Sequence, residues 1–243
     1  TAIGTSALKA NTTGTRNIAM GYGALDAPDT ENDNLAIGYD ALGGSIAGAE
    51  YNVAIGNYSM DATTTGDNNV AIGYQTLSAN TTGLHNTTVG YNAMLLNTEG
   101  NLNVAVGHQA LNKNTSGSNN TVVGTNSMLD NTTGIQNSAF GTDALPRNTT
   151  GGYNTALGGY ALTTSTTASY NTAVGWGSLY ANTTGTRNIA MGYGALDAPD
   201  TENDNLAIGY DALGGAIDGG EYNVAIGNYS LDATTSGDKN TAI

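Results

Sequence analysis

The stretch Asn52-Val53-Ala54-Ile55-Gly56 decides the fold, because the same five-residue pattern recurs along the whole chain at a fixed spacing. The period is 17 residues. It is 18 residues only from Asn34 to Asn52 and from Asn205 to Asn223. A fixed period of about 20 residues is typical of stacked repeats, in which each turn contacts only its neighbours. The asparagines that open the copies are Asn17, Asn34, Asn52, Asn69, Asn86, Asn103, Asn120, Asn137, Asn154, Asn171, Asn188, Asn205, Asn223 and Asn240.

The alternation of side chains inside the pattern predicts a short β-strand. Asparagine, alanine and glycine share one face of this strand, and the large apolar residues between them share the other. Glycine then bends the chain, a second short segment ends in Leu or Met four positions later, and a second turn usually reads Asn-Thr-Thr-Gly, as at Asn80. We expect two strands and two turns per coil, with a positive φ at the glycine of the second turn.

These features predict an all-β protein, a parallel β-solenoid with 17 residues per coil, forming one continuous array of about 14 coils over residues 1–243. We expect the large residue before each glycine and the Leu or Met after it to fill a thin core. The apolar column three positions before the glycine, which includes Ile18, Val53 and Val70, would then remain uncovered. Three parallel copies around one axis would bury that column, so we expect a homotrimer.

A longer repeat is superimposed on the first. Residues 11–72 return as 182–243, an offset of 171 in the numbering, and 55 of 62 positions are identical. Such a duplication suits a shaft of adjustable length. Both chain ends also fall inside a repeat, which leads us to expect a fragment of a longer fibre.

Composition limits the classes of partner and chemistry. Six basic residues stand against 20 acidic ones, a net charge of −14, so we expect no nucleic-acid partner. The chain has no cysteine, which excludes disulfides and cysteine zinc sites. No apolar run is long enough to be a membrane span, and we expect no membrane insertion of this segment.

The repeated asparagine has a mechanical interpretation. Identical amides stacked about 4.8 Å apart can hydrogen-bond along the stack as a ladder. The alternative is a ligand or glycan on each asparagine. The Asn-Thr-Thr sequons are expected to serve turn geometry, with glycosylation as the alternative.

Two further groups of residues are candidates for binding. An aromatic column directly follows the glycines, and it either packs on neighbouring coils or contacts a receptor or glycan. Its members are Tyr22, Tyr39, Tyr74, Tyr91, His108, Trp176, Tyr193 and Tyr210. Acidic residues cluster in two copies of one segment, where they are either solvated loop charges or oxygen ligands for calcium. The calcium candidates are Asp29, Glu31, Asp33, Asp200, Glu202 and Asp204.

No pattern of catalytic residues stands out, so we predict that the protein is not an enzyme. Only two histidines occur, with no nucleophile motif near them. A carboxylate pair for glycoside cleavage is the weakest interpretation of the acidic segment.

The pentads at Asn52, Asn69 and Asn223 resemble the repeats in the head domains of trimeric autotransporter adhesins. The string that runs from Asn171 through Leu179 to Asn182 also resembles repeats in phage tail fibres. The resemblance covers the whole chain, although adhesin heads usually repeat in about 14 residues, and we expect no stalk, anchor or chaperone domain within residues 1–243. It implies a left-handed β-roll in a trimer.

The resemblance also implies a location and a role: an extracellular segment, on a bacterial surface or a virion tail fibre, that attaches to a glycan or protein on a host or prey cell. We therefore expect a shaft or head segment of a fibrous adhesin or tail fibre. The alternative is a carbohydrate-binding or depolymerising fibre segment that uses the aromatic column.

Overall fold

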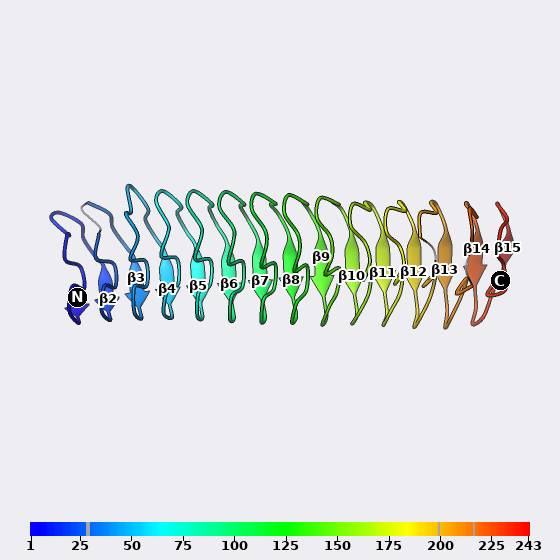
Figure 1. Ribbon diagram of the computed structural model, residues 1–243, viewed down its shortest axis with the longest axis horizontal. Coiled ribbons are helices and arrows are strands. Elements are labelled where there is room, and N and C mark those ends of the chain that lie inside the picture. Colours follow the sequence, from blue (N-terminus) through cyan, green and yellow to red (C-terminus); the bar gives the residue numbers. More distant parts are fainter. Residues whose placement is uncertain (28–29, 199, 216) are drawn as a thin grey trace. The chain divides into compact units, whose positions relative to one another are not determined.

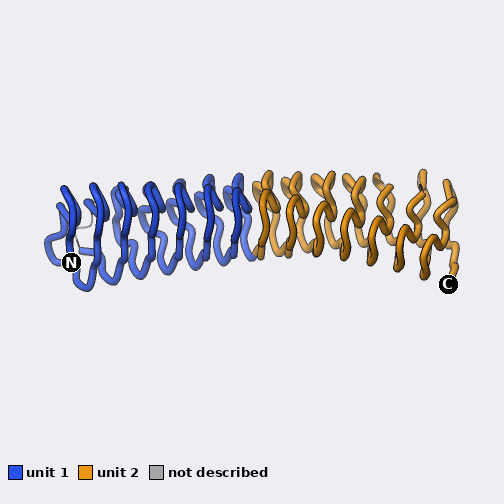
Figure 2. Tube along the Cα trace, turned by 90° about the horizontal axis from the view of Figure 1, so that it is seen from below, with its two compact units in different colours: residues 1–119 blue, residues 120–243 orange. Residues whose placement is uncertain are grey.

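A computed structural model describes residues 1–27, 30–198, 200–215 and 217–243 of the chain. The chain divides into two compact units, residues 1–119 and 120–243 (Figure 2). Both units consist of stacked coils that each contribute one short strand (Figure 1). No helix occurs among the described residues, so none is present there that could cross a membrane.

In both units the strands are very short and follow one another in chain order. The first unit contains β1 (Ala2–Ile3), β2 (Ile18–Met20), β3 (Leu35–Ile37), β4 (Val53–Ile55), β5 (Val70–Ile72), β6 (Thr87–Val89) and β7 (Val104–Val106). The second contains β8 (Thr121–Val123), β9 (Ser138–Phe140), β10 (Thr155–Leu157), β11 (Thr172–Val174), β12 (Ile189–Met191), β13 (Leu206–Ile208), β14 (Val224–Ile226) and β15 (Thr241–Ala242). Within a unit each strand pairs in parallel with the next, equivalent residue to equivalent residue, as Ala54 pairs with Ala71. The predicted parallel β-solenoid with 17-residue coils is confirmed.

The core is thinner than the sequence pattern predicts. In most strands the central residue is an alanine that points inward and is fully buried; Thr88 in β6 and Val122 in β8 take its place. The Leu or Met that ends the second segment of the coil, called the returning segment below, is also fully buried away from the chain ends, and Ala71 and Leu77 are one such pair. Because side chains alternate along a strand, the residues on both sides of the alanine point outward. The prediction that the residue before the glycine fills the core is therefore wrong, and Ile72 at that position is 38% exposed.

The returning segment is not the second strand that we predicted. Its Leu or Met residues have φ between 48° and 57°, and the residue two positions earlier also has a positive φ, as Gln75 does at 49°. A left-handed conformation is incompatible with a β-strand. The segment nevertheless bonds from coil to coil, since the N–H of Leu77 donates to the carbonyl of Ala93 (3.0 Å).

Most coils have two recurring glycines, and these have different reasons for their lack of a side chain. At the bend, Gly73 has a φ of 136°, and a Cβ atom there would lie 2.1 Å from the carbonyl oxygen of Gly90. At the second turn, Gly83 does not have the positive φ that we predicted; a Cβ atom would instead lie 2.3 Å from Oδ1 of Asn80. The turn glycine makes room for a buried asparagine.

The two longer coils keep the strand register. Leu35 pairs with Val53 and Ala36 pairs with Ala54, although one more residue than usual separates the partners. The extra residue falls between the returning segment and the second turn. There Ile46 is buried at the position that Thr63 occupies in the next coil. An insertion is thus absorbed on the side of the coil away from the strand.

Candidate binding surfaces

The recurring asparagines form a buried ladder inside each unit. The N–H of Asn69 donates to Oδ1 of Asn52 (2.9 Å), and its Nδ2 donates to the carbonyl of Gly83 (2.9 Å). The N–H of Asn86 donates in turn to Oδ1 of Asn69 (2.9 Å). Each of these amides therefore connects its own coil to the neighbouring coils. With both polar atoms in use, the amide has no free group to offer a ligand.

A second buried ladder escaped the sequence analysis. In the Asn-Thr-Thr-Gly turns and their variants, Nδ2 of Asn97 donates to Oδ1 of Asn80 (2.9 Å), and Nδ2 of Asn114 donates to Oδ1 of Asn97 (2.7 Å). Asn131 and Asn148 repeat the contact in the second unit (2.8 Å). This asparagine recurs at 17-residue intervals, and that recurrence could have predicted the second ladder from the sequence. Glycosylation of these fully buried amides would require their removal from the core.

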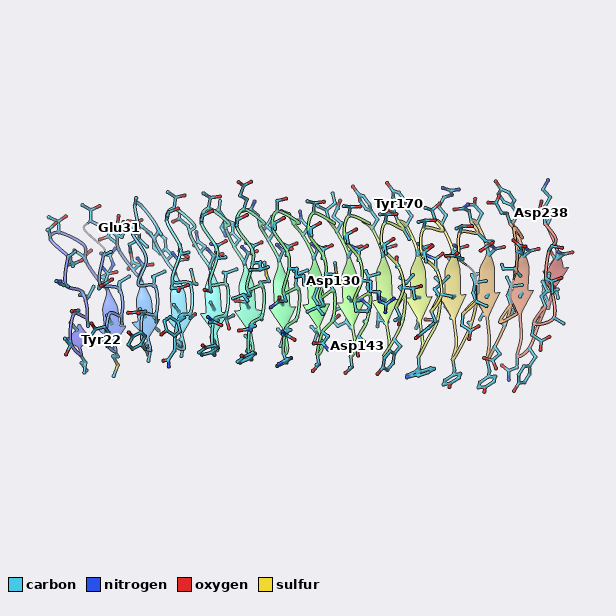
Figure 3. All side chains as sticks on the ribbon, in the orientation of Figure 1. Tyr22, Glu31, Asp130, Asp143, Tyr170 and Asp238 are labelled. Carbon is cyan, nitrogen blue, oxygen red and sulfur yellow. The ribbon has the colours of Figure 1, made fainter. Side chains whose placement is uncertain are left out.

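The aromatic column forms stacked ladders along the bend edge, the edge of the coils at which the recurring glycines follow the strands; Figure 3 shows Tyr22 there. In the first unit Tyr22 stacks on Tyr39 (ring centroids 5.2 Å apart, 11° between planes), and Tyr74 stacks on Tyr91 (5.4 Å, 12°). His108 continues this stack on Tyr91 (5.3 Å, 6°). The faces of these rings stack against one another, so that mainly the ring edges and the polar atoms are exposed to solvent.

The second unit has an equivalent ladder. Trp176 stacks on Tyr193 (4.9 Å, 11°), and Tyr193 stacks on Tyr210 (5.3 Å, 6°). Three rings that the sequence did not single out meet the ladders edge-on: Tyr58 approaches Tyr74 in the first unit (6.1 Å, 86°), and in the second unit Tyr160 approaches Trp176 (5.6 Å, 60°) and Tyr229 approaches Tyr210 (5.3 Å, 62°). They escaped detection because they stand one position further from the glycine than the column does.

The calcium candidates that lie within the described residues are not brought together. Asp33 receives two hydrogen bonds from Arg16 (2.5 and 2.6 Å), and Asp204 receives two from Arg187 (both 2.7 Å). The bonds and charge of Arg16 lower the pKa of Asp33 below its usual range, and Arg187 does the same for Asp204. Within the described part of the chain, no three His, Cys, Asp or Glu side chains are placed to hold a metal ion. Asp29 lies outside the described residues.

Glu31 and Glu202 have a structural role at the turn edge, the edge of the coils formed by the second turns; Figure 3 shows Glu31 there. Each stands one coil after a turn glycine, Gly14 or Gly185, and each is almost fully buried. The carboxylate of Glu202 accepts hydrogen bonds from the N–H groups of Asp200 (2.8 Å), Thr201 (3.0 Å) and Gly219 (3.0 Å). The side chain of Asp200 contacts the hydroxyl of Thr183. These acids hold their own loop together.

Further aspartates gather near the returning segment in each unit. Burial raises the pKa of Asp40, and the negative charges of Asp26 and Asp61 raise it further. In the second unit burial raises the pKa of Asp197, and the charge of Asp211 adds to the effect. These carboxylates repel one another and contribute to the acidity of this side of the coils.

The outer face of the sheet in each unit carries an uncovered apolar column in the single chain, although in the second unit the column before the buried alanines is hydroxylated at Thr121, Ser138, Thr155 and Thr172. In the first unit the residues before and after the buried alanines form two parallel columns of mainly β-branched and aliphatic side chains. Ile18 is 43% exposed and Ile72 is 38% exposed. In the second unit the column before the glycines continues with exposed Phe140 and Leu157.

Comparison with known proteins gave no matching family model, no matching curated sequence and no matching solved structure. The fold class therefore rests on the structure itself.

Proposed function

We propose that this chain is a non-enzymatic structural segment, a shaft or head, of an extracellular fibrous adhesin or phage tail fibre. The apolar outer face of the sheets supports this proposal most directly. A contiguous row of exposed aliphatic side chains on a soluble protein calls for a partner surface. Coils linked by two asparagine ladders suit a segment that spaces and presents a binding surface.

The proposed partner of the apolar face is the same chain in a parallel homotrimer. Three copies around one axis would cover all three sheet faces and leave the bend edges, with their aromatic rings, at the outside. The net charge of −14 on each chain opposes association, so burial of the aliphatic columns must supply the driving force. On the virion or bacterial surface, the trimer would contact a glycan or protein of the target cell.

The mass of the protein in solution tests this assembly. Light scattering should give three chains at low and high concentration. A Val70→Lys substitution on the outer face of β5 should lower the mass to one chain, because lysine resists burial without a partner charge. Thr82→Lys, at an exposed position of the second turn, should leave the mass unchanged. A wild-type monomer at every concentration would overturn the trimer.

The second candidate function is carbohydrate binding or depolymerisation through the aromatic column. The exposed edges of these rings, with Trp176 49% exposed, favour contact with sugars. The stacking geometry limits it, since most ring faces already cover one another. This candidate predicts loss of oligosaccharide binding in Trp176→Ala, whereas a plain shaft predicts no binding in either form.

A further inference from the structure

Two adjoining hollows lie on the second unit, and Tyr180 is a wall of both. The larger, of about 330 Å³, is also lined by Tyr160, Asp143 and Arg147. The smaller, of about 210 Å³, is lined by Trp176, Gly177 and Asp197. The larger hollow is of a size typical of small-molecule sites, and both are lined by the aromatic rings and few polar groups that such sites use.

The ring of Tyr180 differs from the rings of the ladders. It is 42% exposed, and among the described residues it takes part in none of the ring contacts of the second unit. Its main chain is fixed, because the N–H and hydroxyl of Thr164 both donate to its carbonyl (3.1 and 2.9 Å). A positioned aromatic ring outside the stacks offers its face to the C–H groups of a sugar.

Charge restricts which sugar the hollows can accept. The carboxylates of Asp143 and Asp197 line the hollows together with the guanidinium of Arg147, within a chain of net charge −14. Carboxylates accept hydrogen bonds from sugar hydroxyls, and the guanidinium donates to ring and hydroxyl oxygens. A uronic or sialic acid would add a like charge and be repelled. The polar groups therefore favour a neutral saccharide.

The internal duplication supplies a comparison within the same chain. In the offset that relates Asn182 to Asn11, Asp197 corresponds to Asp26, but Trp176 corresponds to Thr5 and Tyr180 to Lys9. The aromatic wall lies just before the duplicated stretch, and the corresponding positions of the first unit carry no ring. Asp197 thus has an acidic counterpart in the first unit, whereas the ring that separates the hollows has none.

We propose that Tyr180 is the platform of a saccharide site on the second unit that takes a neutral hexose oligosaccharide, with one sugar unit on each side of the ring. This site deepens the attachment role proposed above and rests on it. Tyr180 directly follows Leu179, the last residue of the returning segment, and lies across the core from the apolar sheet face. Assembly through the sheet face would leave the site open to a glycan on a target cell.

Saccharide titration tests the site. Neutral tetrasaccharides of glucose, galactose and mannose, and a uronic-acid tetrasaccharide, would be titrated into the full chain by calorimetry and by saturation-transfer NMR. We expect at least one neutral tetrasaccharide to bind and the uronic acid not to bind. Tyr180→Ala should weaken the binding at least about tenfold, the equivalent of about 1.4 kcal/mol.

Two variants separate the site from general effects. Tyr180→Phe keeps the ring and should bind within about twofold of the wild type. Tyr51→Ala removes a similarly exposed tyrosine that lines neither hollow and should also bind normally. Failure of all neutral tetrasaccharides to bind, equal binding by Tyr180→Ala, or preference for the uronic acid would each overturn the proposal. The chain mass by light scattering reports separately on the trimer, so the two proposals can fail independently.

Discussion

The buried Leu77 lies in a backbone conformation that its isomer isoleucine tolerates poorly. Its φ is 55°, and its side chain is fully buried. Leu77 already bears the cost of about 1–2 kcal/mol that a left-handed conformation imposes on an L-residue, and a β-branched side chain adds crowding between its second Cγ and the main chain, which we take to be of similar size. A volume-conserving Leu-to-Ile exchange in an ordinary core usually costs less than about 1.5 kcal/mol. We therefore expect Leu77→Ile to destabilise its coil by about 2–3 kcal/mol.

Leu77→Met is the matched control, because Met60 and Met94 occupy the same position in the two adjacent coils with φ of 55° and 49°. It should cost less than about 1 kcal/mol. Stacked repeats need not unfold in one step, so amide hydrogen exchange of the coil is the appropriate assay. The N–H groups of Leu77 and Ala79, which bond to the next coil, should exchange faster in Leu77→Ile. Equal exchange in the two variants would refute the conformational argument.

Three further substitutions test the bend, the first ladder and the acidic cluster. Gly73→Ala should cost more than about 3 kcal/mol in thermal unfolding, since its Cβ would meet the carbonyl of Gly90 at 2.1 Å in a glycine-only conformation. Asn69→Asp should cost at least about 3 kcal/mol at neutral pH, because a buried carboxylate would face the carbonyl of Gly83 in place of a donor. Asp40→Asn should raise the melting temperature modestly at neutral pH. Because the folded-state pKa of Asp40 is raised, this gain should vanish as the pH falls through that pKa and the wild-type carboxyl is protonated.

Each of these substitutions has a control at a comparable position that should behave differently. Gly177 has a φ of 65° and open space where a Cβ would lie, so Gly177→Ala should cost about 1 kcal/mol. Asn68→Asp, exposed and adjacent to the ladder, should be nearly neutral. Asp33→Asn should show the opposite pH trend to Asp40→Asn, since the lowered pKa of Asp33 gives stability that is lost as the pH falls. Matching behaviour within any pair would contradict the explanation given for it.

The repeat period predicted the fold class, because identical residues at a constant short interval are sufficient to specify stacked coils. The alternation of side chains along the strand did not show which face of the strand points inward. The hydrophobicity of the large residues led us to predict that their face is buried, whereas the alanine face is. The better signal was constancy within the chain: nearly every coil has alanine at the strand centre, whereas the residue before the glycine changes among Ile, Val, Met, Phe and Leu. A thin coil has room for alanine opposite leucine and for little more.

The left-handed backbone of the returning segment was the second feature that we did not predict from the sequence. In the described part of the chain, the non-glycine positions with a positive φ carry Leu, Met, Tyr, Asn, Asp and other residues that are not branched at Cβ, and never Val, Ile or Thr, although these are abundant elsewhere. That exclusion marked the returning segment as something other than a strand. The binding surfaces were harder to predict, because the sequence placed the aromatic column but could not show that its rings cover one another or that Tyr180 stands apart from them.

The small number of interior positions has a consequence for how this protein can change over time. In the coil of residues 69–85 the buried positions are limited to Asn69, Ala71, Thr76, Leu77, Asn80 and Gly83. Most codons of a coil thus specify side chains that meet solvent or a partner, and selection can alter them without disturbing the amide ladders or the leucine column. A lineage that must keep pace with shifting receptors could rewrite such an exterior quickly, while the scaffold beneath it stays the same.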